Sequence, residues 1–195
     1  MDRPWPRELA AGSFSVAAGL PRSRLRPAHL HRPTLSVRSV LAPATVRERA
    51  QAFAIALPDD VAFSHVTAAR LWGMAVPDGV AQDADLDVLR ESDRTRIRRT
   101  GCHGHRGLER RAVELSRGLR VTGLADTWVD LGEVLNRGIG LDDLVVMGDQ
   151  VATWLIPPPE PGSGTVDLDA GVGALRTTLA GSGAAAGCEP AGPGP

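Results

Sequence analysis

The sequence predicts an α+β protein, and three observations lead to this fold class. Several segments place apolar residues at helical spacing, as residues 44–57 and 124–135 do. Residues 83–91 instead alternate apolar with acidic side chains, which is typical of a β-strand. A hydrophobic fraction of 43% in a chain of 195 residues is sufficient for a packed core, which argues against a wholly disordered protein.

The N-terminal region is predicted to contain a helix-turn-helix. Residues 1–12 include two prolines and are expected to be disordered, and residues 13–42 form the next unit. Within it, "SVAAGLPRSRLR" has the pattern of a short helix, a turn at Gly19 and a second helix opened by Pro21. The start of such a second helix faces the major groove, and flanking arginines contact phosphates. We therefore predict DNA binding by Arg22, Arg24, Arg26 and Arg38. The alternatives are a solvated basic arm or a helix that caps the middle domain.

Residues 43–156 are predicted to form a small mixed α+β middle domain. Helices are expected at 44–57, 64–73, 124–135 and 140–156, with Ser64 and Thr122 as caps, Gly73 as a stop and Gly148 as an interruption. Strands are expected at 83–91, 100–106 and 119–123, the first two forming a hairpin around the basic loop 92–99. The predicted core consists of Phe53, Leu71, Trp72, Leu86, Val88, Trp128, Leu131 and Val145.

The stretch "RTGCHGHRG" at 99–107 concentrates side chains that bind metals and transfer protons. On a strand, Cys102 would point away from His103 and His105, because side chains alternate between the two faces. A zinc site needs about four ligands at a defined spacing, and His29, His31 and His65 are remote in the sequence. We therefore predict neither a metal nor a catalytic site, but a polar edge strand. Its basic stripe, facing DNA or an acidic partner, consists of Arg96, Arg98, Arg99, His103, His105 and Arg106.

Two other groups of residues are candidates for chemical sites. His65 lies near a helix start and could act as a base, but neither a nucleophile nor a carboxylate is close in sequence, which favours capping or packing. Asp126 and Asp130 are four residues apart and share a helix face. They could hold a divalent cation or pair with arginines, and no third ligand follows at the required spacing. The sequence therefore predicts no cofactor.

Charge and composition limit the function classes. All 22 basic residues are arginine, and the net charge of −1 means that any contact with nucleic acid depends on a local patch. Two cysteines, no secretory signal and no long apolar stretch predict a cytoplasmic protein without a membrane span. Residues 157–180 are expected to be a Pro/Gly linker with one short helix, and residues 181–195 a disordered tail.

Together, several segments resemble a known family. The order of "SVAAGLPRSRLR", "RPTLSVRS", "FSHVTAARLWGMAVP", "LRVTGLADTWVDLG" and "LDDLVVMGDQVATW" is similar to the actinobacterial AbiEi-family antitoxin-domain proteins, over roughly residues 13–180. The longer members of that family end in an endonuclease domain of the very-short-patch-repair type. This chain departs from the pattern at Ser36, where relatives tend to carry glycine, and in its C-terminal tail, which replaces the nuclease core.

The resemblance implies a degenerate winged-helix segment followed by the antitoxin-like domain. It also implies a function: a DNA-associated regulator of a type IV toxin–antitoxin system, without catalysis of its own and with a toxin protein as partner. The alternative that stays open is a truncated remnant of an endonuclease-like protein, inactive because the nuclease core is missing. The sequence names neither the toxin nor the oligomeric state.

Overall fold

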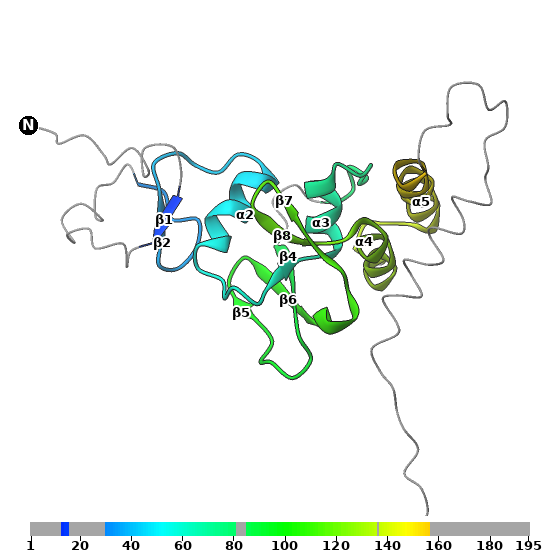
Figure 1. Ribbon diagram of the computed structural model, residues 1–195. Helices are drawn as coiled ribbons and strands as arrows, with labels where there is room; N and C mark the ends of the chain where they lie inside the picture. The colour runs from blue at the N-terminus through cyan, green and yellow to red at the C-terminus, as the bar shows by residue number, and fades with distance from the viewer. Residues whose placement is uncertain (1–12, 16–29, 81–84, 136, 157–195) are drawn as a thin grey trace, which may run out of the picture.

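The computed structural model describes residues 13–15, 30–80, 85–135 and 137–156, and a six-stranded mixed sheet lies at its centre (Figure 1). The strand order is β5-β6-β4-β3-β8-β7, where β3 is Ala62–Phe63, β4 Leu86–Arg90, β5 Arg98–Arg99, β6 Cys102–Arg106, β7 Val113–Ser116 and β8 Leu119–Thr122. The α-helices of the described residues are α2 Val46–Ala54, α3 His65–Trp72, α4 Leu124–Leu131 and α5 Leu141–Leu155, and the 3-10 helices are η2 Leu108–Arg110 and η3 Gly132–Val134. The predicted α+β class is confirmed.

Helix α2 begins with a complete capping box, in which two side chains bond to backbone N–H groups at the start of the helix. The Thr45 side chain accepts a hydrogen bond from the Glu48 backbone N–H at 3.1 Å, and the Glu48 carboxylate accepts one from the Thr45 N–H at 3.1 Å. The helix packs Phe53 into the core beside Phe63 and Val88, which are register partners on β3 and β4. The predicted helix at 44–57 is thus confirmed, with narrower bounds.

Helix α3 follows β3 directly and connects the sheet to the remaining helices. Gly73 ends it in the left-handed conformation at φ 85°, as predicted for this glycine. Ser64 holds the N-cap position but makes no side-chain capping bond; its hydroxyl is hydrogen-bonded to His65 Nδ1 at 2.9 Å instead. At the other end, the Trp72 indole donates a hydrogen bond to the Thr122 carbonyl at 2.8 Å, which fixes the helix to β8.

The predicted hairpin between residues 83–91 and 100–106 is wrong. Strand β6 runs parallel to β4, with Leu86 paired to Cys102 and Arg90 to Arg106. Parallel neighbours need a crossover, and residues 91–97 carry the chain back along the sheet. The antiparallel partner of β6 is instead the two-residue β5, so β6 is the second strand and not the polar edge strand that was predicted.

The C-terminal helices correct three further expectations. Gly123, and not Thr122, is the N-cap of α4, because the Thr122 hydroxyl is hydrogen-bonded to that of Thr127 at 2.8 Å. Helix α5 continues through Gly148 without a break. Val145 faces away from the core with 61% exposure. The side chains of α5 that are fully buried are Met147 and Val151.

The N-terminal part of the described chain is a small two-stranded sheet. Strand β1, Ser13–Ser15, pairs antiparallel with β2, Val37–Ser39. The predicted helix-turn-helix falls mainly at 16–29, which lies outside the described residues, as do residues 1–12 and the linker and tail at 157–195. Within the described ranges, every helix is too short or too polar to cross a membrane.

Candidate functional site

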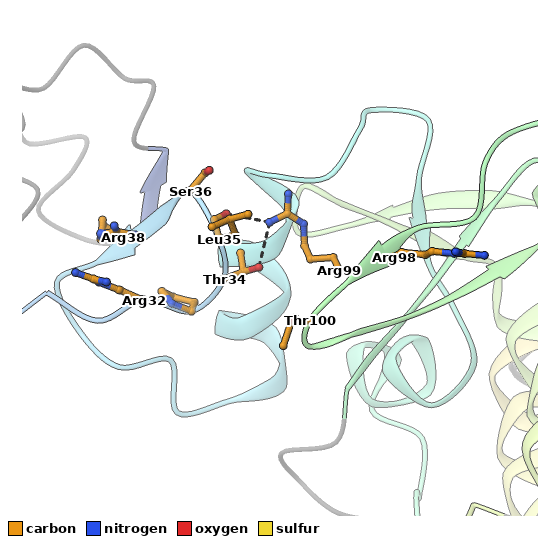
Figure 2. A pocket seen from close by; sticks show the side chains of 9 residues that line it. Arg32, Thr34, Leu35, Ser36, Arg38, Arg98, Arg99 and Thr100 are labelled. Atoms are coloured by element: carbon orange, nitrogen blue, oxygen red, sulfur yellow. Dashed lines mark hydrogen bonds between the residues drawn. The ribbon is translucent and has the colours of Figure 1, made fainter.

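An arginine-rich pocket lies between the N-terminal sheet and the β5–β6 turn (Figure 2). Its volume is about 550 Å³. Four of its nine lining residues are arginines, and none of these described lining residues is acidic. The lining consists of Arg32, Pro33, Thr34, Leu35, Ser36, Arg38, Arg98, Arg99 and Thr100. We call this hollow the arginine pocket.

Two left-handed backbone positions shape the arginine pocket. Ser36 has φ 65°, a left-handed conformation that favours glycine. Gly101, at φ 83°, closes the β5–β6 turn, and a Cβ on it would lie 2.8 Å from the Phe53 ring. Arg99 then bridges the two walls by donating hydrogen bonds to Thr34 Oγ1 at 3.2 Å and to the Leu35 carbonyl at 2.9 Å.

Some of the residues predicted to bind DNA line the arginine pocket, some lie elsewhere on the surface, and others lie outside the described residues. Arg38, Arg98 and Arg99 meet in the arginine pocket, although two separate groups had been predicted to contain them. Arg22, Arg24 and Arg26 lie outside the described residues. The rest of the predicted basic stripe does not form one surface. Arg96 is exposed in the loop before β5, His103 and His105 share one face of β6, and Arg106 alternates to the other.

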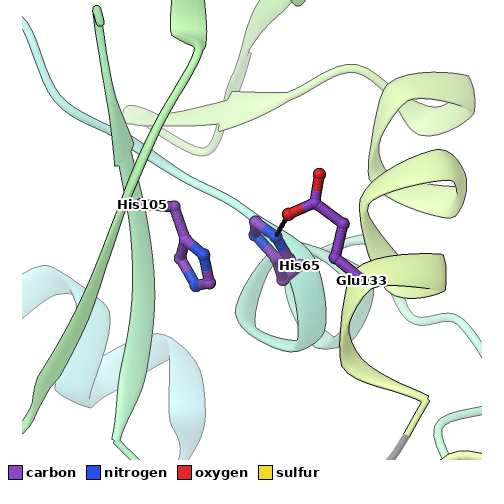
Figure 3. Close-up of side chains that lie close together, drawn as sticks. All are labelled: His65, His105 and Glu133. Carbon is purple, nitrogen blue, oxygen red and sulfur yellow. Dashed lines mark ion pairs between the residues drawn. The ribbon is translucent and has the colours of Figure 1, made fainter.

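A second group of polar side chains lies where β4, β6, α3 and η3 meet, with one member buried, one partly buried and one exposed (Figure 3). His65 is 1% exposed, and its ring is stacked on that of His105 with centroids 3.7 Å apart. Glu133 approaches from η3, with Oε2 at 3.5 Å from His65 Nε2. His65 is therefore remote from His105 in the sequence but in contact with it in the structure. We call His65, His105 and Glu133 the histidine cluster.

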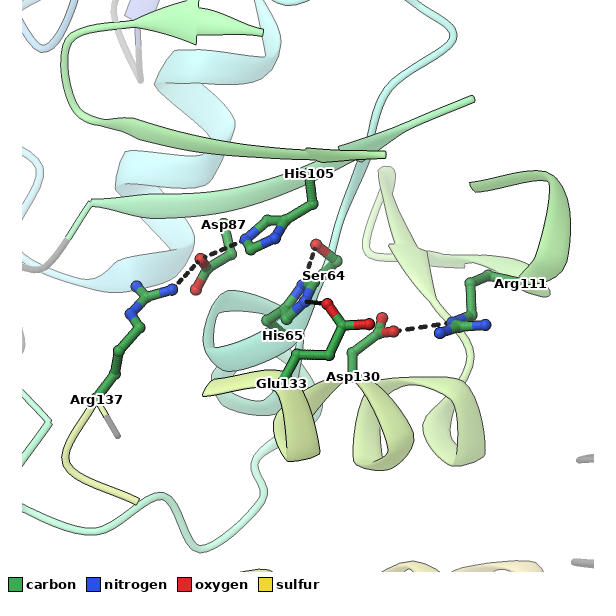
Figure 4. Close-up of polar contacts among 8 residues, drawn as sticks. All are labelled: Ser64, His65, Asp87, His105, Arg111, Asp130, Glu133 and Arg137. Carbon is green, nitrogen blue, oxygen red and sulfur yellow. Dashed lines mark hydrogen bonds and ion pairs between the residues drawn. The ribbon is translucent and has the colours of Figure 1, made fainter. Parts of the chain in front are cut away.

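Asp87 anchors His105 from the centre of the sheet (Figure 4). Its Oδ1 accepts hydrogen bonds from His105 Nε2 at 3.0 Å and from Arg137 at 2.8 Å. Burial acts to raise the pKa of Asp87, but these two hydrogen bonds outweigh it and hold the pKa below its usual value. Asp87 is one of the acidic residues of the alternating segment 83–91, yet it is fully buried, because β4 lies inside the sheet with both of its faces covered.

The backbone and the charge state of His65 are both unusual. His65 has φ 48°, which is uncommon outside glycine and costs of the order of 1 kcal/mol. Burial, together with the neighbouring His105, lowers the pKa of His65 to about 4, so the imidazole is neutral at pH 7. Its Nε2 has no hydrogen-bond partner among the described residues.

A small polar pocket of about 120 Å³ adjoins the histidine cluster. His65 and Glu133 line it, together with Asp130 and three arginines, Arg106, Arg110 and Arg111. Arg111 Nε donates to Asp130 Oδ1 at 2.8 Å, so Asp130 forms one of the ion pairs weighed from the sequence. Burial nevertheless raises the pKa of Asp130 to about 6. Asp126 accepts a hydrogen bond from the Ala112 N–H at 2.6 Å and does not point to a shared ion with Asp130.

The signal that could have located the histidine cluster is weak in the sequence. His65 directly follows a buried strand and Asp87 lies within one, and polar residues at such positions often line sites. Cys102 belongs to neither site. Burial raises the pKa of its thiol to about 12, as it lies in the apolar core with Leu86 and Val88.

Comparison with protein-family models, with curated proteins and with solved structures finds no match to this chain.

Proposed function

We propose that the chain is a DNA-associated regulatory protein of the antitoxin type, which acts without catalysis and contacts the phosphate backbone through the arginine pocket. The observation that carries the proposal is that Arg32, Arg38, Arg98 and Arg99 all line one hollow. Two of these arginines come from the N-terminal segment and two form strand β5. The fold therefore concentrates positive charge that the overall composition does not show.

The chemistry of the pocket suits a phosphate-bearing partner. A guanidinium is permanently charged and presents a planar fork of donors that matches phosphate oxygens. With a net charge of −1, the protein as a whole does not attract DNA, so the binding energy has to come from such a local cluster. Contacts of this kind position a protein on a duplex, whereas base reading needs a further element. The predicted winged-helix segment with Arg22, Arg24 and Arg26 would supply that element.

A protein partner is supported by apolar side chains on α5. Leu141, Val145, Val146 and Trp154 are all more than two-fifths exposed on this one helix. Contiguous exposed apolar residues mark interaction surfaces on soluble domains. A toxin protein bound to α5 would leave the arginine pocket, at the other end of the sheet, accessible to DNA (Figure 1).

The proposal is tested by DNA binding of charge-removal variants. We expect the double variant Arg32→Ala/Arg98→Ala to bind a duplex from the region upstream of its gene at least tenfold more weakly in gel-shift assays. The slope of log affinity against log salt should fall by about one for each lost phosphate contact. Arg94→Ala/Arg120→Ala removes the same charge from exposed positions outside the pocket and serves as the matched control.

Two outcomes would count against this function. Equal affinity of the pocket variant and its control would leave the arginine pocket without a role in DNA binding. Cleavage of plasmid DNA by the purified chain with Mg²⁺ or Mn²⁺ would contradict a function without catalysis. The variant Arg22→Ala/Arg24→Ala tests the predicted helix-turn-helix separately, and we expect the same weaker binding and flatter salt dependence.

A further inference from the structure

We propose that the histidine cluster is a binding site for a zinc-class divalent metal ion, with His65, His105 and Glu133 as its protein ligands. Two imidazoles and one carboxylate are a ligand set that zinc accepts. One ligand atom from each residue lies within 4.8 Å of the others. The site is independent of the arginine pocket, since it is built from α3, β6 and η3.

One pair of ligand atoms, from His65 and Glu133, already has the separation that a bound ion requires. Zinc lies about 2.0–2.2 Å from its nitrogen and oxygen ligands, so two ligands at a tetrahedral angle are about 3.4 Å apart. His65 Nε2 and Glu133 Oε2 are 3.5 Å apart. This distance is too long for a good hydrogen bond but fits the separation of two ligands on one zinc ion. His105 would complete the set by turning out of its stack with His65, since its ligand atom lies within 4.8 Å of the other two.

Each of the two histidine rings uses one nitrogen for a hydrogen bond to a neighbouring residue, so its other nitrogen is available to the ion. His65 Nδ1 is hydrogen-bonded to the Ser64 hydroxyl at 2.9 Å, which leaves Nε2. His105 Nε2 donates to Asp87 Oδ1 at 3.0 Å, which leaves Nδ1. A histidine that donates its second N–H to a carboxylate or hydroxyl is the usual arrangement at metal sites, because the outer bond fixes the ring and its tautomer.

The Nε2 atom of His65 makes no hydrogen bond among the described residues, and Glu133 Oε2 lies 3.5 Å from it. The His65 side chain is almost completely buried. Burying a polar atom in this way costs free energy, which a metal bond would offset. The left-handed backbone at His65 adds to that cost and aims the ring at His105 and Glu133 (Figure 3).

The fourth coordination position opens to the small pocket beside the cluster. Three protein ligands with an open fourth position distinguish exchangeable zinc sites from closed structural ones. Arg106, Arg110 and Arg111 line this pocket, so water or a small anion would complete the coordination. Asp130, next to them, is held by Arg111 and is not needed as a ligand (Figure 4).

The test is metal titration of the chelator-treated chain, purified without a histidine tag. We expect one Zn²⁺ to bind per chain in competition with a chromogenic chelator, and Co²⁺ to give the visible absorption of a tetrahedral complex. His65→Gln and Glu133→Gln should each weaken Zn²⁺ binding at least tenfold. His103→Gln and Glu114→Gln alter exposed residues of the same types outside the cluster, and we expect them to leave binding unchanged.

Thermal unfolding keeps the proposal falsifiable if His65→Gln does not fold. Glu133 is 66% exposed, so Glu133→Gln should fold normally. Zn²⁺ at a hundredfold excess over its Kd should raise the Tm of the wild-type chain by roughly 5–10 °C, and that of Glu133→Gln clearly less. No saturable binding, binding that Glu133→Gln does not weaken, or an equal loss in His103→Gln would overturn the proposal.

Discussion

His65 and His105 stack with their ring centroids 3.7 Å apart and an angle of 19° between the planes, although one begins α3 and the other lies on β6. Two imidazoles can lie this close when at least one is neutral, and burial keeps His65 so at pH 7. The pair depends on Asp87, which holds His105 by a hydrogen bond of 3.0 Å. Removing the Asp87 carboxylate therefore tests how much these contacts contribute to folding stability.

Asp87→Ala should destabilise the protein by about 2–3 kcal/mol, because it leaves His105 and Arg137 without their shared acceptor. Arg137 is partly exposed and can be hydrated, which keeps the expected loss below that of a fully buried pair. Urea denaturation at pH 7 measures the change in the free energy of unfolding. Asp85→Ala, two residues earlier at an exposed position, is the control and should change it by less than about 0.5 kcal/mol. Equal effects of the two substitutions would contradict the anchoring role of Asp87.

Gly148→Ala should destabilise the protein by about 1–2 kcal/mol, despite the better helix propensity of alanine. A Cβ at position 148 would lie 2.9 Å from Trp128 Nε1, and that indole donates a hydrogen bond to the Leu144 carbonyl at 2.8 Å. The ring would have to move out of its contact with α5. Thermal or urea unfolding measures the effect.

Gly132→Ala is the matched control for Gly148→Ala. Gly132 has φ −60°, and a Cβ on it would have no heavy atom within 4 Å. We expect this substitution to raise stability by up to about 1 kcal/mol, because alanine restricts the unfolded chain and suits a helical backbone. The prediction for Gly148 fails if both alanines stabilise the protein.

The Cys102 thiol should be unreactive in the folded protein. Burial raises its pKa to about 12, so at pH 8 only about one molecule in ten thousand carries the thiolate that attacks alkylating reagents. In a Cys188→Ser variant, which leaves Cys102 as the sole cysteine, iodoacetamide should label the native chain far more slowly than the chain in 8 M urea. Labelling of the native chain at the rate of free cysteine would show that the thiol is not buried.

Local sequence patterns determined most helices and strands of the middle domain. The apolar spacing of α2 and the αL stop at Gly73 act within a few residues, so the sequence predicts them directly. The sharing of one face by His103 and His105 follows likewise from the alternation along a strand. The positions of α2 and α3 along the sequence follow from the same local patterns.

Only the tertiary structure decided which strands pair and which polar residues meet. Periodicity cannot show whether β6 returns beside β4 as a hairpin or after a crossover, because both choices expose the same alternation of side chains. The parallel choice places β4 inside the sheet, which buries Asp87 and brings His105 against His65. The arginine pocket has the same origin, since its two walls are far apart in the sequence and Arg99 joins them through Thr34 and Leu35. Contacts between distant segments depend on the packing of the whole sheet, and the free energy of that packing is not contained in any single stretch of sequence.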